Sequence, residues 1–296
     1  MRIAYKTELG VFYNGKVEEA LKSKKFDKYK KKVNLLFTSP PFPLNRKKKY
    51  GNLQGEAYID WLSGLAIQLR DYLKDDGSIV IEVGNSWEPG IPVMSTLALK
   101  SLLAFLERGG YHLCQQFIWY NSAKLPTPAQ WVNVERSRVK DSFTQIWWMS
   151  KTPKPKANNK RVLQEYSKSM KYLLKTQKYN AGKRPSEHQI GETSFLKKNK
   201  GSIPSNVLIS SNTHANTRYQ QYCRKHELIP HPARMPIDIP KFFIKFLTNK
   251  KNLVWDPFGG SNTTGEAAES LGRKWIAIEP DENYIKGSKG RFAKRI

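Results

Sequence analysis

Residues 254–281, "VWDPFGGSNTTGEAAESLGRKWIAIEPD", contain a strand, a glycine-rich turn, a helix and a second strand in immediate succession. The short apolar run that ends at Asp256 is typical of a buried strand. Thr263 and Glu266 fit a capping box, so we expect a helix to begin there and to end at a glycine. The next apolar run predicts a second buried strand that ends at Glu279. A strand–helix–strand unit of this kind is typical of a parallel α/β sheet.

The turn and the strand ends of this unit suit a nucleotide-type cofactor. Glycines let the backbone approach a ligand closely, and the N-terminus of a helix has free N–H groups. An acid at the end of the second strand, here Glu279, can accept hydrogen bonds from both hydroxyls of a ribose. Because the turn does not read GxGxxG, the pattern favours a cofactor with a ribose but no phosphate. A purely structural turn with an acidic strand end is the alternative.

A second motif, "TSPPF" (38–42), follows an apolar run near the N-terminus. Two consecutive prolines stiffen the backbone and remove two N–H donors. The Ser39 hydroxyl and the carbonyls of Ser39 and Pro40 can therefore converge as acceptors around an amino group, while Phe42 provides a flat face for a base. The alternatives are a structural proline turn and a polyproline ligand. The polyproline interpretation fits poorly, because the segment directly continues a buried strand.

The charge balance predicts a polyanionic partner. The chain of 296 residues has 51 Lys and Arg against 25 Asp and Glu, a net charge of +26. No run of about 18 apolar residues predicts a membrane-spanning helix, and the N-terminus lacks the apolar core of a signal peptide. We therefore expect nucleic acid, and not a membrane, as the partner.

The cysteines and histidines predict neither a disulfide framework nor a metal site. Cys114 and Cys223 lie far apart without a CxxC pattern, and the five histidines show no metal-binding spacing. This use of cysteine fits a reducing cytoplasm.

Apolar runs and helical periodicity alternate along most of the chain. Strands are expected at 33–39, 78–84, 111–120, 141–150, 252–257 and 274–280. Helices are expected within 14–32, where "VEEALKSKKF" passes into a Lys-rich connection, at 56–73, at 94–107, around Phe242, Phe243, Phe246 and Leu247, and from 263. This alternation predicts a doubly wound, mainly parallel sheet.

Residues 151–200 differ in composition from the rest of the chain. They contain 14 Lys and Arg against 3 Asp and Glu, with poor apolar periodicity. A solvated linker or a partly disordered insertion is one interpretation, because charge runs are usually solvated. The interleaved Tyr166, Tyr172, Tyr179 and Phe195 equally fit an ordered module that faces nucleic acid.

Taken together, "TSPPF" and "DPFGGSNTTG" with Glu279 resemble the amino-methyltransferases of DNA restriction–modification systems. The order of the motifs, catalytic motif first and cofactor motif last, resembles their circularly permuted beta class. The segments "TSPPFPLNRKKKYGN", "WYNSAKLPTPAQWVN" and "IWWMSKT" resemble the PvuII-type cytosine-N4 enzymes in particular, and "HPARMP" resembles the segment before the cofactor motif. The resemblance covers about 1–150 and 226–296.

The resemblance implies a Rossmann-like α/β sheet of the S-adenosyl-L-methionine-dependent methyltransferases, circularly permuted, with a variable basic target-recognition region. Residues 1–150 would form the catalytic part of the methyltransferase domain, 151–225 the target-recognition region and 226–296 the cofactor-binding part. The implied contacts to S-adenosyl-L-methionine are Thr38, Asp256, Pro257, Phe258, Gly259, Gly260, Ser261, Asn262, Thr263, Thr264 and Glu279.

The implied reaction is transfer of a methyl group to cytosine N4 in double-stranded DNA. A flipped base would stack on an aromatic ring, and backbone acceptors would orient its nitrogen for direct in-line transfer, with no covalent enzyme intermediate and no strong base. The catalytic residues would be Ser39, Pro40, Pro41 and Phe42. The expected DNA contacts are Arg46, Lys47, Lys48, Lys49, Lys124, Lys154, Lys156, Lys160 and Arg161.

Two other functions stay open at this point. Adenine-N6 methylation is the first, because either base could stack on Phe42. A non-catalytic nucleic-acid-binding protein with a methyltransferase fold is the second. As partners we expect double-stranded DNA and a cognate restriction endonuclease that forms no stable complex with the chain, which would itself be a monomer or homodimer.

Asn262 departs from the wider family, most of which has glycine at this position. Asparagine is one of the few residues that adopt the left-handed conformation readily. We therefore expect the turn to need only a small adjustment.

Overall fold

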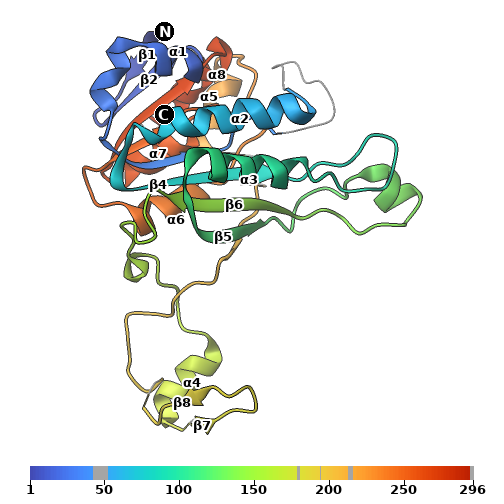
Figure 1. Cartoon of the computed structure of the whole chain (residues 1–296), viewed down its shortest axis with the longest axis vertical. Coiled ribbons are helices and arrows are strands. Elements are labelled where there is room, and N and C mark those ends of the chain that lie inside the picture. Colours follow the sequence, from blue (N-terminus) through green and yellow to red (C-terminus); the bar gives the residue numbers. More distant parts are fainter. Residues whose placement is uncertain (43–52, 179–180, 194, 213–215, 294–296) are drawn as a thin grey trace. The chain divides into compact units, whose positions relative to one another are not determined.

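The computed structural model describes residues 1–42, 53–178, 181–193, 195–212 and 216–293. Within these residues the centre is a nine-stranded sheet of order β1-β2-β11-β10-β3-β4-β6-β5-β9 (Figure 1). Its strands are β1 Arg2–Lys6, β2 Gly10–Asn14, β3 Val33–Thr38, β4 Leu73–Gly84, β5 His112–Tyr120, β6 Phe143–Ser150, β9 Val207–Ile209, β10 Leu253–Asp256 and β11 Lys274–Glu279.

The sheet is mainly parallel, which confirms the predicted fold class. β2, β11, β10, β3 and β4 run in the same direction, whereas β6 is antiparallel to both β4 and β5. Although β10 and β11 come last in the chain, β10 lies between β11 and β3. This crossover brings the N-terminal and C-terminal motifs onto neighbouring strands.

Helices cover both faces of the sheet, so that buried strands carry apolar residues on both sides. α1 Val17–Lys22, α2 Gly55–Arg70 and α3 Leu97–Gly109 pack on one face, and α6 Asp238–Leu247, α7 Thr263–Ser270 and α8 Glu282–Ser288 on the other. In β3, Leu36 belongs to the first core, whereas Leu35 and Phe37 belong to the second. No helix among the described residues is long and apolar enough to cross a bilayer.

The N-terminal segment contains a hairpin that the sequence did not predict, before the short helix expected within 14–32. Residues 2–14 form the hairpin β1–β2, and β2 joins the sheet beside β11. Only the short α1 and a 3-10 helix at Lys24–Tyr29 follow. Phe12 and Tyr13 are buried in opposite cores, an arrangement that a strand provides and a helix does not.

Two helix ends also differ from the expectation. α2 ends at Arg70 and not at residue 73, because Leu73 pairs with Val33 at the start of β4. α7 begins where expected, but its cap is Asn262 and not Thr263, since the Asn262 Oδ1 accepts a hydrogen bond from the Gly265 N–H at 3.1 Å.

Residues 151–225, the predicted target-recognition region, contribute to two compact units. Residues 158–205 form the smaller unit, with α4 Lys168–Thr176 and the two-stranded ribbon of β7 Gly182–Lys183 and β8 Gln189–Ile190. Residues 206–225 belong to the larger unit, where β9 pairs with β5 and is followed by α5 Arg218–Lys225.

Candidate active site

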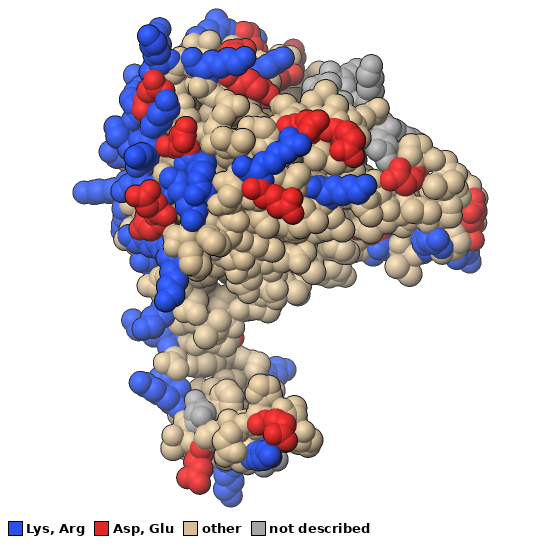
Figure 2. Space-filling view, in the orientation of Figure 1, with Lys and Arg blue, Asp and Glu red and all other residues tan. Residues whose placement is uncertain are grey.

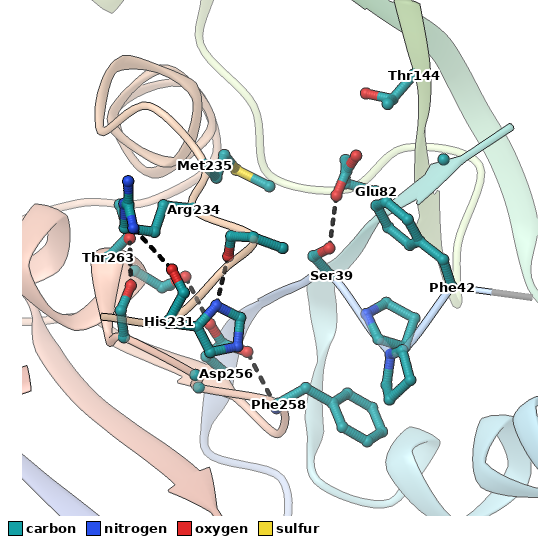
Figure 3. Close-up of a pocket in the computed structure, with 18 of the residues that line it drawn as sticks. Ser39, Phe42, Glu82, Thr144, His231, Arg234, Met235, Asp256, Phe258 and Thr263 are labelled. Atoms are coloured by element: carbon teal, nitrogen blue, oxygen red, sulfur yellow. Dashed lines mark hydrogen bonds between the residues drawn. The ribbon is translucent and has the colours of Figure 1, made fainter. Parts of the chain in front are cut away.

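The two sequence motifs meet at one edge of the sheet. Because parallel strands end side by side, β3, β10 and β11 bring the ends of both motifs together. A cavity of about 570 Å³ lies there (Figure 3), lined by all four residues from Ser39 to Phe42. Of the eleven expected cofactor contacts, nine line this cavity as well, whereas Thr38 and Asn262 lie behind its wall.

Asp256 fixes the turn between β10 and α7. Its Oδ1 accepts hydrogen bonds from the Thr38 hydroxyl at 2.7 Å and from the Phe258 N–H at 3.1 Å. Its Oδ2 accepts from the Thr264 hydroxyl at 2.6 Å. Burial raises the pKa of Asp256, and these hydrogen bonds oppose the rise. The Asp256 carboxylate thus links the end of β3 to the first turn of α7. Thr38 contributes to the site through its hydrogen bond to this carboxylate.

Glu279, at the end of β11, binds the same turn from the other side. Its two carboxylate oxygens accept hydrogen bonds from the Gly260 N–H at 2.9 Å and the Asp281 N–H at 3.0 Å. Burial raises the pKa of Glu279 to about 7, although both backbone bonds lower it. Gly260 has a φ of +48°, a conformation that favours glycine. A Cβ at Gly259 would lie 2.9 Å from the Phe12 ring, so the turn needs glycine there too.

Asn262 adopts the left-handed conformation with a φ of 61°, as expected. While its Oδ1 caps α7, its Nδ2 donates a hydrogen bond to the Tyr5 hydroxyl at 3.0 Å. The Tyr5 hydroxyl in turn bonds to that of Ser288 at 2.7 Å. The asparagine therefore connects the turn to β1 and to α8, contacts that glycine could not make.

Arg291 supports the turn from the C-terminal segment. Its guanidinium donates to the Ser261 carbonyl, to the Ser261 hydroxyl at 2.8 Å and to the Glu266 carboxylate at 2.6 Å. It also lies over the Tyr219 ring, 4.7 Å from the centroid. Sequence reasoning missed Arg291, because nothing local distinguishes it from the other basic residues near it.

The "HPARMP" segment (231–236) closes the cavity next to the turn. The His231 N–H donates to the Tyr219 hydroxyl, and Arg234 donates to the His231 carbonyl, each at 2.8 Å. A Cβ on Gly260 would lie 3.2 Å from the His231 ring. Burial lowers the pKa of His231, which favours the neutral imidazole beside the turn.

Ser39 is paired with an acid that sequence reasoning missed. Its hydroxyl donates to Glu82 Oε2 at 2.5 Å (Figure 3). Glu82 lies on β4, the strand next to β3, and is only 2% exposed. Burial raises its pKa to about 7, against the opposing effects of the Ser39 hydrogen bond and the Lys124 charge. The available signal was one acid inside the otherwise apolar strand "SIVIEVG" (78–84).

The rest of the "TSPPF" motif is held in place by its neighbours. The Tyr58 hydroxyl donates to the Pro41 carbonyl at 2.7 Å. The Phe42 ring lies against Gly84 at the end of β4, where a Cβ would be 2.5 Å from the ring. Glycine at this position therefore allows an aromatic face to border the cavity beside Ser39.

Of the expected DNA contacts that the structure describes, Lys124 alone lines the cavity. Its ammonium lies 3.3 Å from the Asp141 carboxylate, which is nearly buried. The expected contacts Arg46, Lys47, Lys48 and Lys49 lie outside the described residues.

Four expected DNA contacts remain, two in the larger unit and two in the smaller unit. Lys154 and Lys156 follow the end of β6, at the edge of the sheet opposite the cavity, and the Lys156 N–H donates to the Asp76 carbonyl. Lys160 and Arg161 belong to a 3-10 helix of the smaller unit. Within the described residues of the larger unit, Lys154 and Lys156 therefore do not join Lys124 at the cavity.

The family comparison agrees with this geometry. A family model described as DNA methylase, for N6 and N4 methyltransferases, matches residues 33–290. The type II methyltransferase M.PvuII of Proteus hauseri is 42% identical over 291 residues, which cover 98% of this chain and 85% of that protein.

Solved structures give the same result. The structure titled PvuII DNA methyltransferase (cytosine-N4-specific) matches with a TM-score of 0.79 at 36% identity, over 99% of this chain and 90% of that one. The M1.HpyAVI–SAM complex matches with a TM-score of 0.57 at 19% identity, over 97% and 100%, and shares the fold. The cavity built from both motifs, the matched family model and the extent of these similarities place this chain in the DNA methylase family.

Proposed function

We propose that this chain methylates cytosine N4 in double-stranded DNA with S-adenosyl-L-methionine, as part of a restriction–modification system. The observation that carries the proposal is one cavity in which the Ser39–Glu82 pair and Phe42 lie with the turn after Asp256 and with Glu279. One part of it provides acceptors and an aromatic face for a base, and the other provides groups that suit a ribose. The 42% identity to a type II methyltransferase supports the same reaction.

The residues of the turn fit S-adenosyl-L-methionine, which supplies an electrophilic methyl group when bound. Each Glu279 oxygen accepts one backbone N–H and keeps a further lone pair for a ribose hydroxyl. The turn from Gly259 to Thr264 leads into the N-terminus of α7, which favours the carboxylate of the methionine part. The cavity volume of about 570 Å³ falls within the usual range of small-molecule sites.

Arg291→Ala is expected to raise the KM for S-adenosyl-L-methionine by about tenfold with little change in kcat, because the turn loses three charge-assisted hydrogen bonds behind its cofactor face. Steady-state kinetics at varied cofactor concentrations measure KM and kcat separately. Arg291→Lys keeps the charge beside Glu266 but loses the planar fork, so we expect an intermediate KM. Equal KM values for all three proteins would contradict a positioning role.

The catalytic residues act mainly by alignment. Because the Ser39 hydroxyl donates its proton to Glu82, its oxygen lone pairs are available to accept from an N4–H group. Flipping the base costs a few kcal/mol, and stacking on Phe42 returns about 1–3 kcal/mol. Once the nitrogen is methylated, its surplus proton can pass through Ser39 to Glu82, whose pKa of about 7 suits an acceptor at neutral pH.

The choice of cytosine over adenine is supported by the similarity to the structure titled cytosine-N4-specific. An Asp or Asn at residue 39 would extend an acceptor beyond the backbone, whereas the shorter Ser39, whose proton goes to Glu82, presents only its oxygen to the amine. DNA methylated with this protein and digested to nucleosides should contain N4-methyl-2′-deoxycytidine, identified by mass spectrometry. N6-methyl-2′-deoxyadenosine without N4-methyl-2′-deoxycytidine would refute the proposal in favour of adenine-N6 methylation.

A non-catalytic DNA-binding role is the second alternative. Both motifs are complete and line one cavity, which favours an active enzyme. Incubation with labelled cofactor and bulk DNA tests this, since label transfer would exclude the non-catalytic role.

We expect residues 151–225 to hold much of the target recognition. The smaller unit within this range exposes Tyr172 to 70% and Phe195 to 47%, and such aromatics can contact bases. Replacing residues 158–205 with the matching segment of a relative should change the methylated sequence, as read by long-read sequencing of DNA from expressing cells. An unchanged sequence would assign recognition elsewhere, most directly to the 121–140 loop.

A cognate endonuclease that shares the recognition sequence completes the proposed system. We expect no stable complex with it, and we expect the methyltransferase to act in the cytoplasm as a monomer or homodimer.

A further inference from the structure

The edge of the sheet opposite the cavity is strongly basic. β3, β4, β10 and β11 begin side by side at this edge, and lysines precede or open each of these strands. Figure 2 shows Lys and Arg gathered along the side where these strands begin in Figure 1. We name this surface the basic edge and define it by Lys31, Lys32, Lys74, Lys154, Lys156, Lys250, Lys251 and Lys274.

The charge of the basic edge is not neutralised within the chain. All eight lysines are exposed, and none forms an ion pair with another described residue. The acids of these segments are Asp71, Asp75 and Asp76 in the turn before and within β4, Asp27 before β3 and Glu8 before β2. Of these, Asp75 lies 3.7 Å from Lys151, and Asp27 pairs with Lys30 at 2.8 Å. Eight lysines thus outnumber five acids, and this surplus supports binding of a polyanion.

The basic edge is too far from the cavity to bind the phosphates beside a flipped base. β3 runs from Val33 at the basic edge to Thr38 at the cavity, which is five residue steps or about 17 Å. A duplex whose target base occupies the cavity lies at the other end of the same strands. The lysines therefore face away from that duplex.

The spacing of the basic edge fits a duplex backbone. From β11 through β10, β3 and β4 to β6, neighbouring strands lie about 4.8 Å apart, so the row extends over about 19 Å. Duplex DNA carries one negative charge per about 1.7 Å of its axis, so this length covers several phosphates.

The surface chemistry favours duplex DNA over other polyanions. No large apolar side chain is exposed in the described edge loops 28–32, 71–77, 151–156, 249–252 and 272–274. Insertion into a membrane surface needs such side chains, and single-stranded nucleic acid needs exposed aromatic rings for stacking. Binding of the phosphates of a duplex backbone needs only the lysines.

We propose that the basic edge binds a second segment of duplex DNA, independently of its sequence, while the target duplex occupies the cavity. The inference rests on DNA being the substrate, as proposed above. It gives the enzyme two DNA-binding surfaces at opposite ends of the same strands. An enzyme with both surfaces can hold one DNA segment while it samples another.

The test compares two variants with equal charge change. The edge variant carries Lys31→Gln, Lys32→Gln, Lys250→Gln, Lys251→Gln and Lys274→Gln. The control variant carries the same substitution at five lysines exposed on helices or beside them: Lys22, Lys100, Lys245, Lys286 and Lys289. The enzyme is first saturated with a short duplex that contains its methylation site, identified by sequencing, and with S-adenosylhomocysteine. Binding of a second, fluorescent duplex without that site is then titrated at several salt concentrations.

We expect the edge variant to bind the second duplex at least about tenfold more weakly than the wild type and the control variant. Its log–log salt slope should fall by about 4.5, or about 0.9 for each of five lost phosphate contacts. Single-turnover methylation of the short duplex should be unchanged. Equal second-duplex binding by both variants would overturn the proposal, and so would a loss of methylation equal to the loss of binding. The proposal would also be overturned if the basic edge bound vesicles that contain anionic lipid but did not bind the second duplex. Absent methylation by the wild type would instead refute the proposed function.

Discussion

Asp256→Ala is expected to weaken the binding of S-adenosyl-L-methionine by about 100-fold or more. The substitution leaves the Thr38 hydroxyl, the Thr264 hydroxyl and the Phe258 N–H without their shared acceptor. Hydrogen bonds to a charged group contribute about 1.5–3 kcal/mol each, so the loss of two already amounts to about 3 kcal/mol. Isothermal titration calorimetry with the cofactor measures the effect, and Glu279→Ala should weaken binding as well.

Glu269→Ala is the matched control for this experiment. Glu269 is also on α7 and accepts hydrogen bonds from the Trp275 indole at 2.6 Å and from the Thr7 hydroxyl, but it does not line the cavity. We expect it to lower the thermal midpoint and to leave cofactor affinity unchanged. A folded Asp256→Ala protein with wild-type affinity would remove this turn from the cofactor site.

Glu82→Gln is expected to lower the methyl-transfer rate by about 100-fold at neutral pH. The amide keeps the shape of the side chain, but it can neither accept the surplus proton nor hold the Ser39 hydroxyl as strongly. Positioned acids and bases contribute typically 10²–10⁴-fold, so about 100-fold is the lower limit of that range. Single-turnover kinetics with saturating DNA and cofactor isolates this step from binding.

The pH dependence of the methyl-transfer rate tests whether Glu82 is the group that accepts the proton. Burial raises the pKa of Glu82 to about 7, so the acceptor form is lost as the pH falls below 7. The wild-type rate should therefore fall by about tenfold per pH unit in the acidic range and level off above pH 7. The Glu82→Gln protein should lack this acidic limb.

Glu279 also has a pKa of about 7, but its protonation should change cofactor affinity and hence KM. At a saturating cofactor concentration the rate therefore responds to the protonation of Glu82 and not to that of Glu279. An acidic limb that persists in Glu82→Gln would assign the titration to another group.

Local sequence determined the parts of the site that lie within one strand–turn unit. The apolar run, the glycines and Glu279 predicted the β10–α7–β11 unit, because each of these signals acts over a few residues. The left-handed Asn262 was predictable for the same reason, since its conformation is an intrinsic preference. Both motifs lie in the larger of the two compact units.

The parts that sequence missed depend on contacts between distant residues. Glu82 meets Ser39 because β4 lies next to β3, which places its carboxylate 43 residues away in sequence but 2.5 Å from the Ser39 hydroxyl. Arg291 reaches Ser261 across 30 residues. The hairpin of residues 2–14 was missed because β11 stabilises it from the far end of the chain. The charge of Lys154 and Lys156 predicted DNA contacts without giving their place, and the direction of β6 puts them at the basic edge, away from the cavity.

The position of β10 between β11 and β3 has a consequence for synthesis on the ribosome. β3 is made early, yet its neighbour on one side is residues 253–256, more than two hundred residues later. At translation rates of about 5–20 residues per second, β2 and β3 wait on the order of ten seconds or longer for these partners. The nascent chain therefore exposes one unpaired edge of β3 throughout this interval, which makes it a candidate for chaperone binding. The half formed by β3, β4, β6 and β5 can pair first, so the cofactor half is the last to fold.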